Sequence, residues 1–379
     1  MNTNPLQKLE ALGQSIWLDY IRRDLIASGK LKKLIIEDSL RGMTSNPSIF
    51  EKAFAENHDY DQDIEKMSHD GKKVDKIYET LAQKDVQDAA DEFRNLYNQT
   101  NGQDGYVSLE VNPHLAHDTQ GTIEEARRLW KALDRPNVFI KVPATKEGLP
   151  AIQQLISEGI NINVTLLFGL SRYREVAQAY IAGIKARLEK GQTVKQIASV
   201  ASFFLSRIDV FLDPIFEKCI TENSEKSQLA KQLEGQVAIT SAKIAYHIYN
   251  EIFNNNSFKK LAEKGANSQR LLWASTSTKN PKYSDIKYVE ALIGPHTVNT
   301  LPIETIDAYR DHGDPKARLE LDLDKATDFF QRLPELDINI DQVTQQLENE
   351  GVDKFTKSYD QLIETLNKKI SKTNSKEKQ

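Results

Sequence analysis

The feature that most limits the fold is a regular alternation of short apolar runs with longer amphipathic stretches along nearly the whole chain of 379 residues. This alternation is typical of a parallel sheet whose strands are joined by helices packed outside it. We expect eight strands, near residues 15–19, 41–45, 106–111, 138–142, 161–166, 198–204, 271–275 and 288–293. Eight such units predict the α/β class and a closed (β/α)8 barrel of the TIM type.

Two stretches, residues 50–100 and 213–265, are longer than a minimal barrel requires, and both have helical patterns. Neither contains a linker rich in Pro or Gly, so we expect one domain over residues 1–379 with two helical insertions. After about residue 322 the sequence is helical and strongly charged. We therefore predict additional helices, a helical C-terminal segment and a flexible tail over residues 366–379.

The composition excludes several classes of partner. The net charge is −5, so no overall field attracts nucleic acid, and an anionic substrate would need a local basic pocket. No apolar run approaches the roughly 20 residues that cross a bilayer. The polar start MNTNPLQKLEALGQ is unlike a signal peptide. We expect a cytoplasmic protein without nucleic-acid or membrane partners, present as a monomer or a homodimer.

Lys141 is the most unusual charge, because it lies in the apolar run VFIKVP. Burial in a barrel interior would disfavour the ammonium and favour the free amine, which is the form that attacks a carbonyl group. The alternative is that Lys141 ends an edge strand and extends its amine into water, as most lysines do. Lys146, beside Glu147 in the following turn, is the natural comparison for a solvated lysine.

Polar side chains stand at the C-terminal ends of the expected strands, which converge on one site in a barrel of this type. They are Asp19, Asn46, Glu110, Lys141, Asn163, Thr165 and Ser202, followed by Phe204 and Arg207. Each polar residue alone has an explanation as a cap, a turn or a surface residue. Together, two carboxylates, two amides, two hydroxyls and an amine suit a polyhydroxylated carbonyl substrate.

Other chemistries lack their usual signals. The sequence contains no GxGxxG, GxxxxGK[ST] or HExxH motif. His114 and His117 form an HxxH pair, but no further run of ligands accompanies them, so a solvated turn is favoured over a metal site. We expect neither a metal nor a cofactor.

Six segments in this order resemble the transaldolase family: TSNPSIF, VSLEVNP, FIKVPATKEGLPAI, GININVTLLF, ASFFLSRID and WASTSTKNP. The resemblance covers most of the chain. It implies a (β/α)8 barrel with a Schiff-base lysine on the fourth strand, where Lys141 falls. It also implies transfer of a dihydroxyacetone unit from sedoheptulose 7-phosphate or fructose 6-phosphate to glyceraldehyde 3-phosphate or erythrose 4-phosphate, in the non-oxidative pentose phosphate pathway.

The resemblance also implies a role for each site residue. Lys141 would form the Schiff base, and Asp19 would take the proton of the C4 hydroxyl as the C3–C4 bond breaks. Glu110, through a water that Thr165 helps to hold, would assist formation and dehydration of the carbinolamine. The residues that would hydrogen-bond the donor's hydroxyl groups are Asn46, Asn163 and Ser202.

The match departs from the family at the phosphate. Arg207 fits the first phosphate arginine, but the second, expected after the seventh strand, is absent, and Lys279 with Ser277 takes its place. Related aldolases, which release free dihydroxyacetone, carry glutamine and tyrosine where this chain has Glu110 and Phe204, and both differences favour a transferase. The other alternative is a non-catalytic barrel that binds sugar phosphates or a protein partner.

Overall fold

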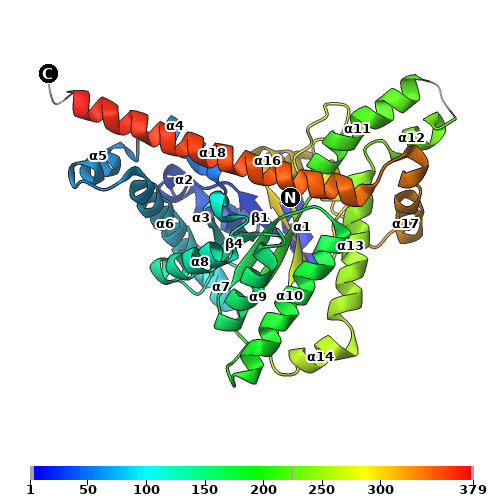
Figure 1. Cartoon of the computed structure of the whole chain (residues 1–379), viewed down its shortest axis with the longest axis horizontal. Helices are drawn as coiled ribbons and strands as arrows, with labels where there is room; N and C mark the ends of the chain where they lie inside the picture. Colours follow the sequence, from blue (N-terminus) through cyan, green and yellow to red (C-terminus); the bar gives the residue numbers. More distant parts are fainter. Residues whose placement is uncertain (1–3, 223–224, 377–379) are drawn as a thin grey trace.

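The computed structural model describes residues 4–222 and 225–376, with side chains described up to Ser371. Eight parallel strands close into a barrel in chain order, with helices outside them (Figure 1). The predicted (β/α)8 barrel is confirmed. The strands are β1 (Gln14–Asp19), β2 (Leu40–Thr44), β3 (Tyr106–Glu110), β4 (Val138–Pro143), β5 (Ile162–Leu167), β6 (Ser199–Phe204), β7 (Arg270–Ala274) and β8 (Thr297–Leu301).

The helices surround the barrel and extend it at both long stretches. Residues 50–100 hold α4 to α7, and residues 213–265 hold the end of α11 and α12 to α14. The described helices are α1 (Pro5–Ala11), α2 (Arg23–Ala27), α3 (Lys30–Glu37), α4 (Pro47–Glu56), α5 (Asp61–His69), α6 (Val74–Glu92), α7 (Arg94–Gln99), η1 (Pro113–Leu115), α8 (Thr119–Leu133), α9 (Gly148–Glu158), α10 (Leu170–Glu189), α11 (Ser206–Thr221), α12 (Ser227–Leu233), α13 (Val237–Phe253), α14 (Asn256–Ala262), α15 (Lys287–Glu290), α16 (Ile303–His312), α17 (Leu323–Gln331), η2 (Leu333–Leu336) and α18 (Ile340–Lys376).

One predicted strand is wrong. Residues 288–293 contain the end of α15 and the turn after it, and the eighth strand is β8, which lies further along the chain. The apolar residues Tyr288, Val289, Leu292 and Ile293 are buried, but a short apolar run does not distinguish a strand from a helical segment. β8 was missed because Thr297 and Asn299, both fully buried, make its sequence polar.

Strand register places the polar residues side by side at the barrel mouth. Glu110 of β3 pairs with Lys141 of β4, and Lys141 pairs in turn with Asn163 of β5. Asp19 of β1 pairs with Thr44 of β2. Alternate residues of a strand face the same side, so the positions two residues earlier also face the interior. The side chains predicted to act together therefore come from adjacent strands.

An aromatic layer fills the barrel beneath these residues. Trp17 precedes Asp19 by two residues, and Phe139 precedes Lys141 by two. Phe139 stacks on both Trp17 and Tyr106, with ring centroids 5.9 and 4.3 Å apart. A Cβ atom at Gly42 would come within 2.6 Å of the Trp17 ring, so glycine is required there for the layer to pack. The layer closes the barrel below the polar residues.

The C-terminal helix α18 packs across the barrel mouth, from α11 and β5 on one side to α4 and α5 on the other (orange to red in Figure 1). The tail predicted from residue 366 needs correction, because this helix continues to Lys376 and Leu366 is fully buried. Residues 377–379 of that tail lie outside the described residues. Within the described part of the chain, no helix has the length and apolar character needed to span a membrane.

Candidate active site

A cavity of about 1110 Å³ opens at the C-terminal ends of the barrel strands. Most of the predicted site residues line it, namely Asp19, Asn46, Lys141, Thr165, Ser202, Phe204, Arg207, Ser277 and Lys279. The other two, Glu110 and Asn163, lie deeper, with 7% and 0% of their surface exposed. Both contact residues that line the cavity, so the structure brings all eleven predicted residues into one site.

Lys141 projects from β4 into the barrel mouth and is 5% exposed, which excludes the solvated alternative. Its Nζ lies 3.1 Å from Oε2 of Glu110 and donates a hydrogen bond of 3.0 Å to the backbone oxygen of Ser45. Lys146, the comparison lysine, is exposed. A buried amine beside a carboxylate can exchange a proton with it over a single hydrogen-bond distance.

Burial raises the pKa of the Glu110 carboxyl, and the positive charge of Lys141 acts in the opposite direction. Oε1 of Glu110 and Oγ1 of Thr165 are buried and have no hydrogen-bond partner among the described residues. Buried polar groups are nearly always satisfied by protein or by water, so these two atoms are suited to hold a water molecule or a substrate hydroxyl.

Asp19 is the last residue of β1 and faces the same cavity. Oγ1 of Thr44 donates a 2.7 Å hydrogen bond to Oδ1 of Asp19 and lies 2.7 Å from the hydroxyl of Thr300. Burial raises the pKa of Asp19, while Lys141 lowers it. Among the described residues, Asp19 and Lys141 do not form an ion pair within 4 Å, and Lys141 pairs with Glu110 instead. A substrate carbon can therefore lie between the Asp19 carboxylate and the Lys141 amine.

A chain of hydrogen bonds connects the next strands. Ser202 Oγ donates to Asn163 Oδ1 over 2.6 Å, and Asn163 Nδ2 donates to Ser108 Oγ over 3.1 Å. Ser202 lines the cavity, whereas Asn163 lies behind it and holds Ser202. Asn46 caps α4 by accepting a hydrogen bond from the backbone of Ile49, which leaves its amide NH2 for the cavity.

Cations gather at another part of the cavity. Arg207 is the second residue of α11, and burial lowers the pKa of its guanidinium. The Cζ atom of this guanidinium lies 5.6 Å from the centre of the Phe204 ring. Lys279, after β7, donates a 2.5 Å hydrogen bond to Ser277 Oγ. A guanidinium and an ammonium in one cavity make it suited to an anion such as phosphate.

The contribution of α18 to the cavity was not predicted from the sequence. Lys354, Phe355 and Ser358 of this helix line the cavity, and the Phe355 ring centre lies 5.9 Å from Nζ of Lys141. Phe355 is 6% exposed, although it stands in a segment that the sequence shows mainly as charged. The sequence signal that could have indicated a buried face of α18 is the spacing of three and four residues between its inward positions.

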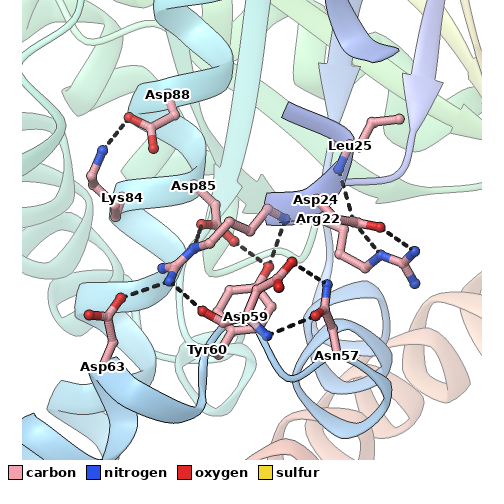
Figure 2. A network of polar contacts seen from close by, with 11 residues as sticks. Arg22, Asp24, Leu25, Asn57, Asp59, Tyr60, Asp63, Lys84, Asp85 and Asp88 are labelled. Atoms are coloured by element: carbon pink, nitrogen blue, oxygen red, sulfur yellow. Dashed lines mark hydrogen bonds and ion pairs between the residues drawn. The ribbon is translucent and has the colours of Figure 1, made fainter. Parts of the chain in front are cut away.

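A buried network fixes the segment that follows Asp19 (Figure 2). The backbone N–H of Arg23 donates to the hydroxyl of Tyr60 over 2.9 Å, and that hydroxyl donates to Asp85 over 2.7 Å. The Arg23 guanidinium reaches Asp85 and also Asp63, at 3.3 and 2.7 Å. The loop after β1 is thereby tied to α5 and α6.

His114 and His117 are paired separately, with Asp360 and with Glu147, at 2.8 and 3.1 Å. Both imidazoles are exposed to solvent. Among the residues that the structure describes, no group of three or more His, Cys, Asp or Glu side chains is arranged to hold a metal ion.

Comparison of the sequence with known proteins identifies the family of this chain. The model of the Transaldolase/Fructose-6-phosphate aldolase family matches residues 16–366. The transaldolase of Trichodesmium erythraeum is 51% identical over 377 residues, which cover 98% of this chain and 99% of that protein. Transaldolase 2 of Nostoc punctiforme is 46% identical over 376 residues, 98% of each chain. The transaldolase of Saccharopolyspora erythraea is 44% identical over 372 residues, 98% of this chain and 99% of that protein. The chain therefore belongs to the transaldolase/fructose-6-phosphate aldolase family, as an enzyme of the transaldolase type.

Proposed function

We propose that this enzyme transfers a dihydroxyacetone unit between sugar phosphates through a Schiff base on Lys141. The donor is sedoheptulose 7-phosphate or fructose 6-phosphate, and the acceptor is glyceraldehyde 3-phosphate or erythrose 4-phosphate. The observation that carries the proposal is the buried amine of Lys141, 3.1 Å from Glu110, in a cavity that it shares with Asp19. The reaction belongs to the non-oxidative pentose phosphate pathway, and we propose a cytoplasmic location.

The first stage forms the imine. Glu110 accepts a proton from the Lys141 ammonium, and the free amine attacks the ketone carbon of the donor. Proton transfers then give a neutral carbinolamine. The raised pKa of Glu110 favours its protonated form at this point, so it can return the proton to the departing hydroxyl, which leaves as water. Thr165, whose hydroxyl oxygen has no partner among the described residues, holds that water.

The second stage breaks the carbon–carbon bond. Asp19 removes the proton of the C4 hydroxyl, the C3–C4 electron pair moves toward the cationic imine nitrogen, and an aldose phosphate leaves. The three carbons of dihydroxyacetone stay on Lys141 as an enamine. A base with a raised pKa is a stronger proton acceptor, so burial of Asp19 supports this role.

The third stage reverses the chemistry on a second substrate. The enamine carbon attacks the aldehyde of the acceptor, and Asp19 returns its proton to the new alkoxide. Water, delivered with the help of Glu110, then hydrolyses the imine and frees Lys141. Every proton removed in the first half is returned in the second, so the cycle requires no external reductant or oxidant.

The family name covers both transaldolases and aldolases, so transfer must be distinguished from simple release. Glu110 and Phe204 favour transfer, because related aldolases resemble this chain elsewhere but carry glutamine and tyrosine at these positions. The rate of fructose 6-phosphate cleavage should depend on an added acceptor aldehyde. A comparable rate without any acceptor would show that the chain is an aldolase.

Borohydride trapping tests the central assignment. Reduction in the presence of fructose 6-phosphate should leave a covalent adduct on the peptide that contains Lys141. Lys141→Ala should abolish both the adduct and turnover while the protein still unfolds cooperatively. The exposed Lys146 provides the matched control, and Lys146→Ala should keep activity. An adduct on Lys146, or no adduct, would refute the mechanism.

A further inference from the structure

One face of α18 forms part of the cavity wall. Gly351, Lys354, Phe355 and Ser358 are spaced by three, one and three residues, which places them on one side of a helix. The last three line the cavity. A Cβ atom at Gly351 would lie 3.0 Å from Cδ2 of Leu166 and 3.5 Å from Nη1 of Arg207, so the helix backbone passes close to that guanidinium. The position of Lys354, one turn later, is therefore fixed relative to Arg207.

Phe355 anchors this face from the other side of Lys354. Its ring centre is 5.9 Å from Cζ of Arg207 and 5.9 Å from Nζ of Lys141. The side chain is nearly fully buried, so α18 cannot move away without exposing it. Lys354 is thus held on the cavity side by a close backbone contact before it and a buried ring after it.

The charge around Lys354 is positive, and no carboxylate among the described residues forms an ion pair with it. The charge of Arg207 lowers the pKa of Lys354, followed by burial and by the charge of Lys279. Among the described side chains, no carboxylate lies within 4 Å of any of these three cations; Glu350 acts on Arg207 only at longer range. Like charges that share a cavity without a partner favour the binding of an anion.

We propose that Lys354 is a phosphate-binding residue, which joins Arg207 and Lys279 in holding the phosphate of the sugar substrate. This inference rests on the proposed function and extends it to a residue outside the barrel. A phosphate monoester carries a charge between −1 and −2 at neutral pH, and one arginine fork leaves part of that charge unmatched. Two ammonium groups, one from the loop after β7 and one from α18, supply the remaining positive charge in place of a second guanidinium.

Lys357 provides the comparison on the same helix. It stands three residues after Lys354. Both side chains are exposed, but Lys357 does not line the cavity. The two lysines have the same charge and lie on the same helix, but only Lys354 is on the cavity face. Replacing each with methionine keeps most of the length of the side chain and removes its ammonium group.

Steady-state kinetics with fructose 6-phosphate and erythrose 4-phosphate tests the proposal. Lys354→Met should raise KM for fructose 6-phosphate about tenfold and weaken inhibition by inorganic phosphate by a similar factor, since a charged hydrogen bond is lost. The value of kcat should stay within about twofold, because the bonds that react are elsewhere. Lys354→Arg should restore most of the affinity, and Lys357→Met should behave as the unmodified protein.

A substrate without phosphate separates phosphate binding from a structural effect. Borohydride trapping of dihydroxyacetone on Lys141 should proceed equally in the unmodified protein and in Lys354→Met. Unchanged inhibition by inorganic phosphate in Lys354→Met would overturn the inference, as would equal losses with both kinds of substrate. If the unmodified protein traps no sugar on Lys141, the proposed function fails. Direct calorimetric binding of inorganic phosphate to the two variants would still decide the role of Lys354.

Discussion

The network behind the loop that follows Asp19 makes a prediction about stability and pH (Figure 2). Asp85 of α6 is fully buried and accepts hydrogen bonds from Tyr60 and from Arg23. Burial raises the pKa of Asp85 to about 6 from the usual 3.8, although Tyr60 and Arg23 oppose the change. The ionised form of this carboxyl is therefore tolerated at neutral pH only at a cost to the folded state.

The sign and the size follow from proton linkage. A carboxyl group with a higher pKa in the folded state binds its proton more tightly when folded. Its stabilising contribution is complete below the unfolded pKa of 3.8 and is lost as the pH rises through about 6. At about 1.4 kcal/mol per pKa unit, the whole loss is ~3 kcal/mol, of which ~2 kcal/mol falls between about pH 4.5 and about pH 7.5.

Asp85→Asn removes this titration and keeps an oxygen that can accept from Tyr60. Urea unfolding of both proteins across that pH range should show the free energy of unfolding of the unmodified protein falling by ~2 kcal/mol relative to the variant. Asp88→Asn, which changes an ion-paired carboxylate near the surface of the same helix, should alter this difference by less than about 0.5 kcal/mol. Parallel curves for Asp85→Asn and the unmodified protein would refute the reasoning.

Two further predictions concern the barrel. Thr44→Val removes a hydrogen bond that lowers the pKa of Asp19, so the acid limb of the kcat/KM profile for ketose cleavage should move to higher pH. An unmoved limb would argue against Asp19 as the base. Gly42→Ala should destabilise the fold by about 1–3 kcal/mol in chemical denaturation, because the new methyl group meets the buried Trp17 ring at 2.6 Å. An unchanged midpoint would mean that this aromatic layer can shift.

Lys141, Asp19 and Glu110 could be predicted as candidate catalytic residues because each stands at or near the end of a strand, with a clear alternation of strand and helix around it. Lys141 was marked by its apolar neighbours, and the barrel topology brought Asp19 and Glu110 to it from other strands. The eighth strand was mispredicted for the opposite reason. Its residues Thr297, Asn299 and Thr300 are buried but polar, so it lacks the apolar signal on which strand prediction depends.

The contribution of α18 could not be predicted from the strands. Residues 354–358 are more than 200 positions from Lys141 in sequence, and no repeat or turn signal links them to the barrel. Only packing reveals that the segment crosses the mouth, where Gly351 and Phe355 contact the interior. The charges of α18 suggested a solvated helix and tail, since a lysine on a cavity face and one in bulk water look alike in sequence.

The site thus divides into two parts with different geometric demands. In the proposed mechanism, Lys141, Glu110 and Asp19 take part in bond making and proton transfer, which require short distances and fixed orientation. Strands β1, β3 and β4 of a closed barrel hold these three side chains in place. In that mechanism the phosphate does not react, and we expect its binding to depend mainly on total positive charge. Charges can therefore come from a loop at Lys279 and from a helix at Lys354, and a lysine pair can replace a guanidinium fork without disturbing the reacting bonds. On this proposal, the chain can retain the chemistry of Lys141 while its phosphate-binding cations differ from those that the family resemblance implies.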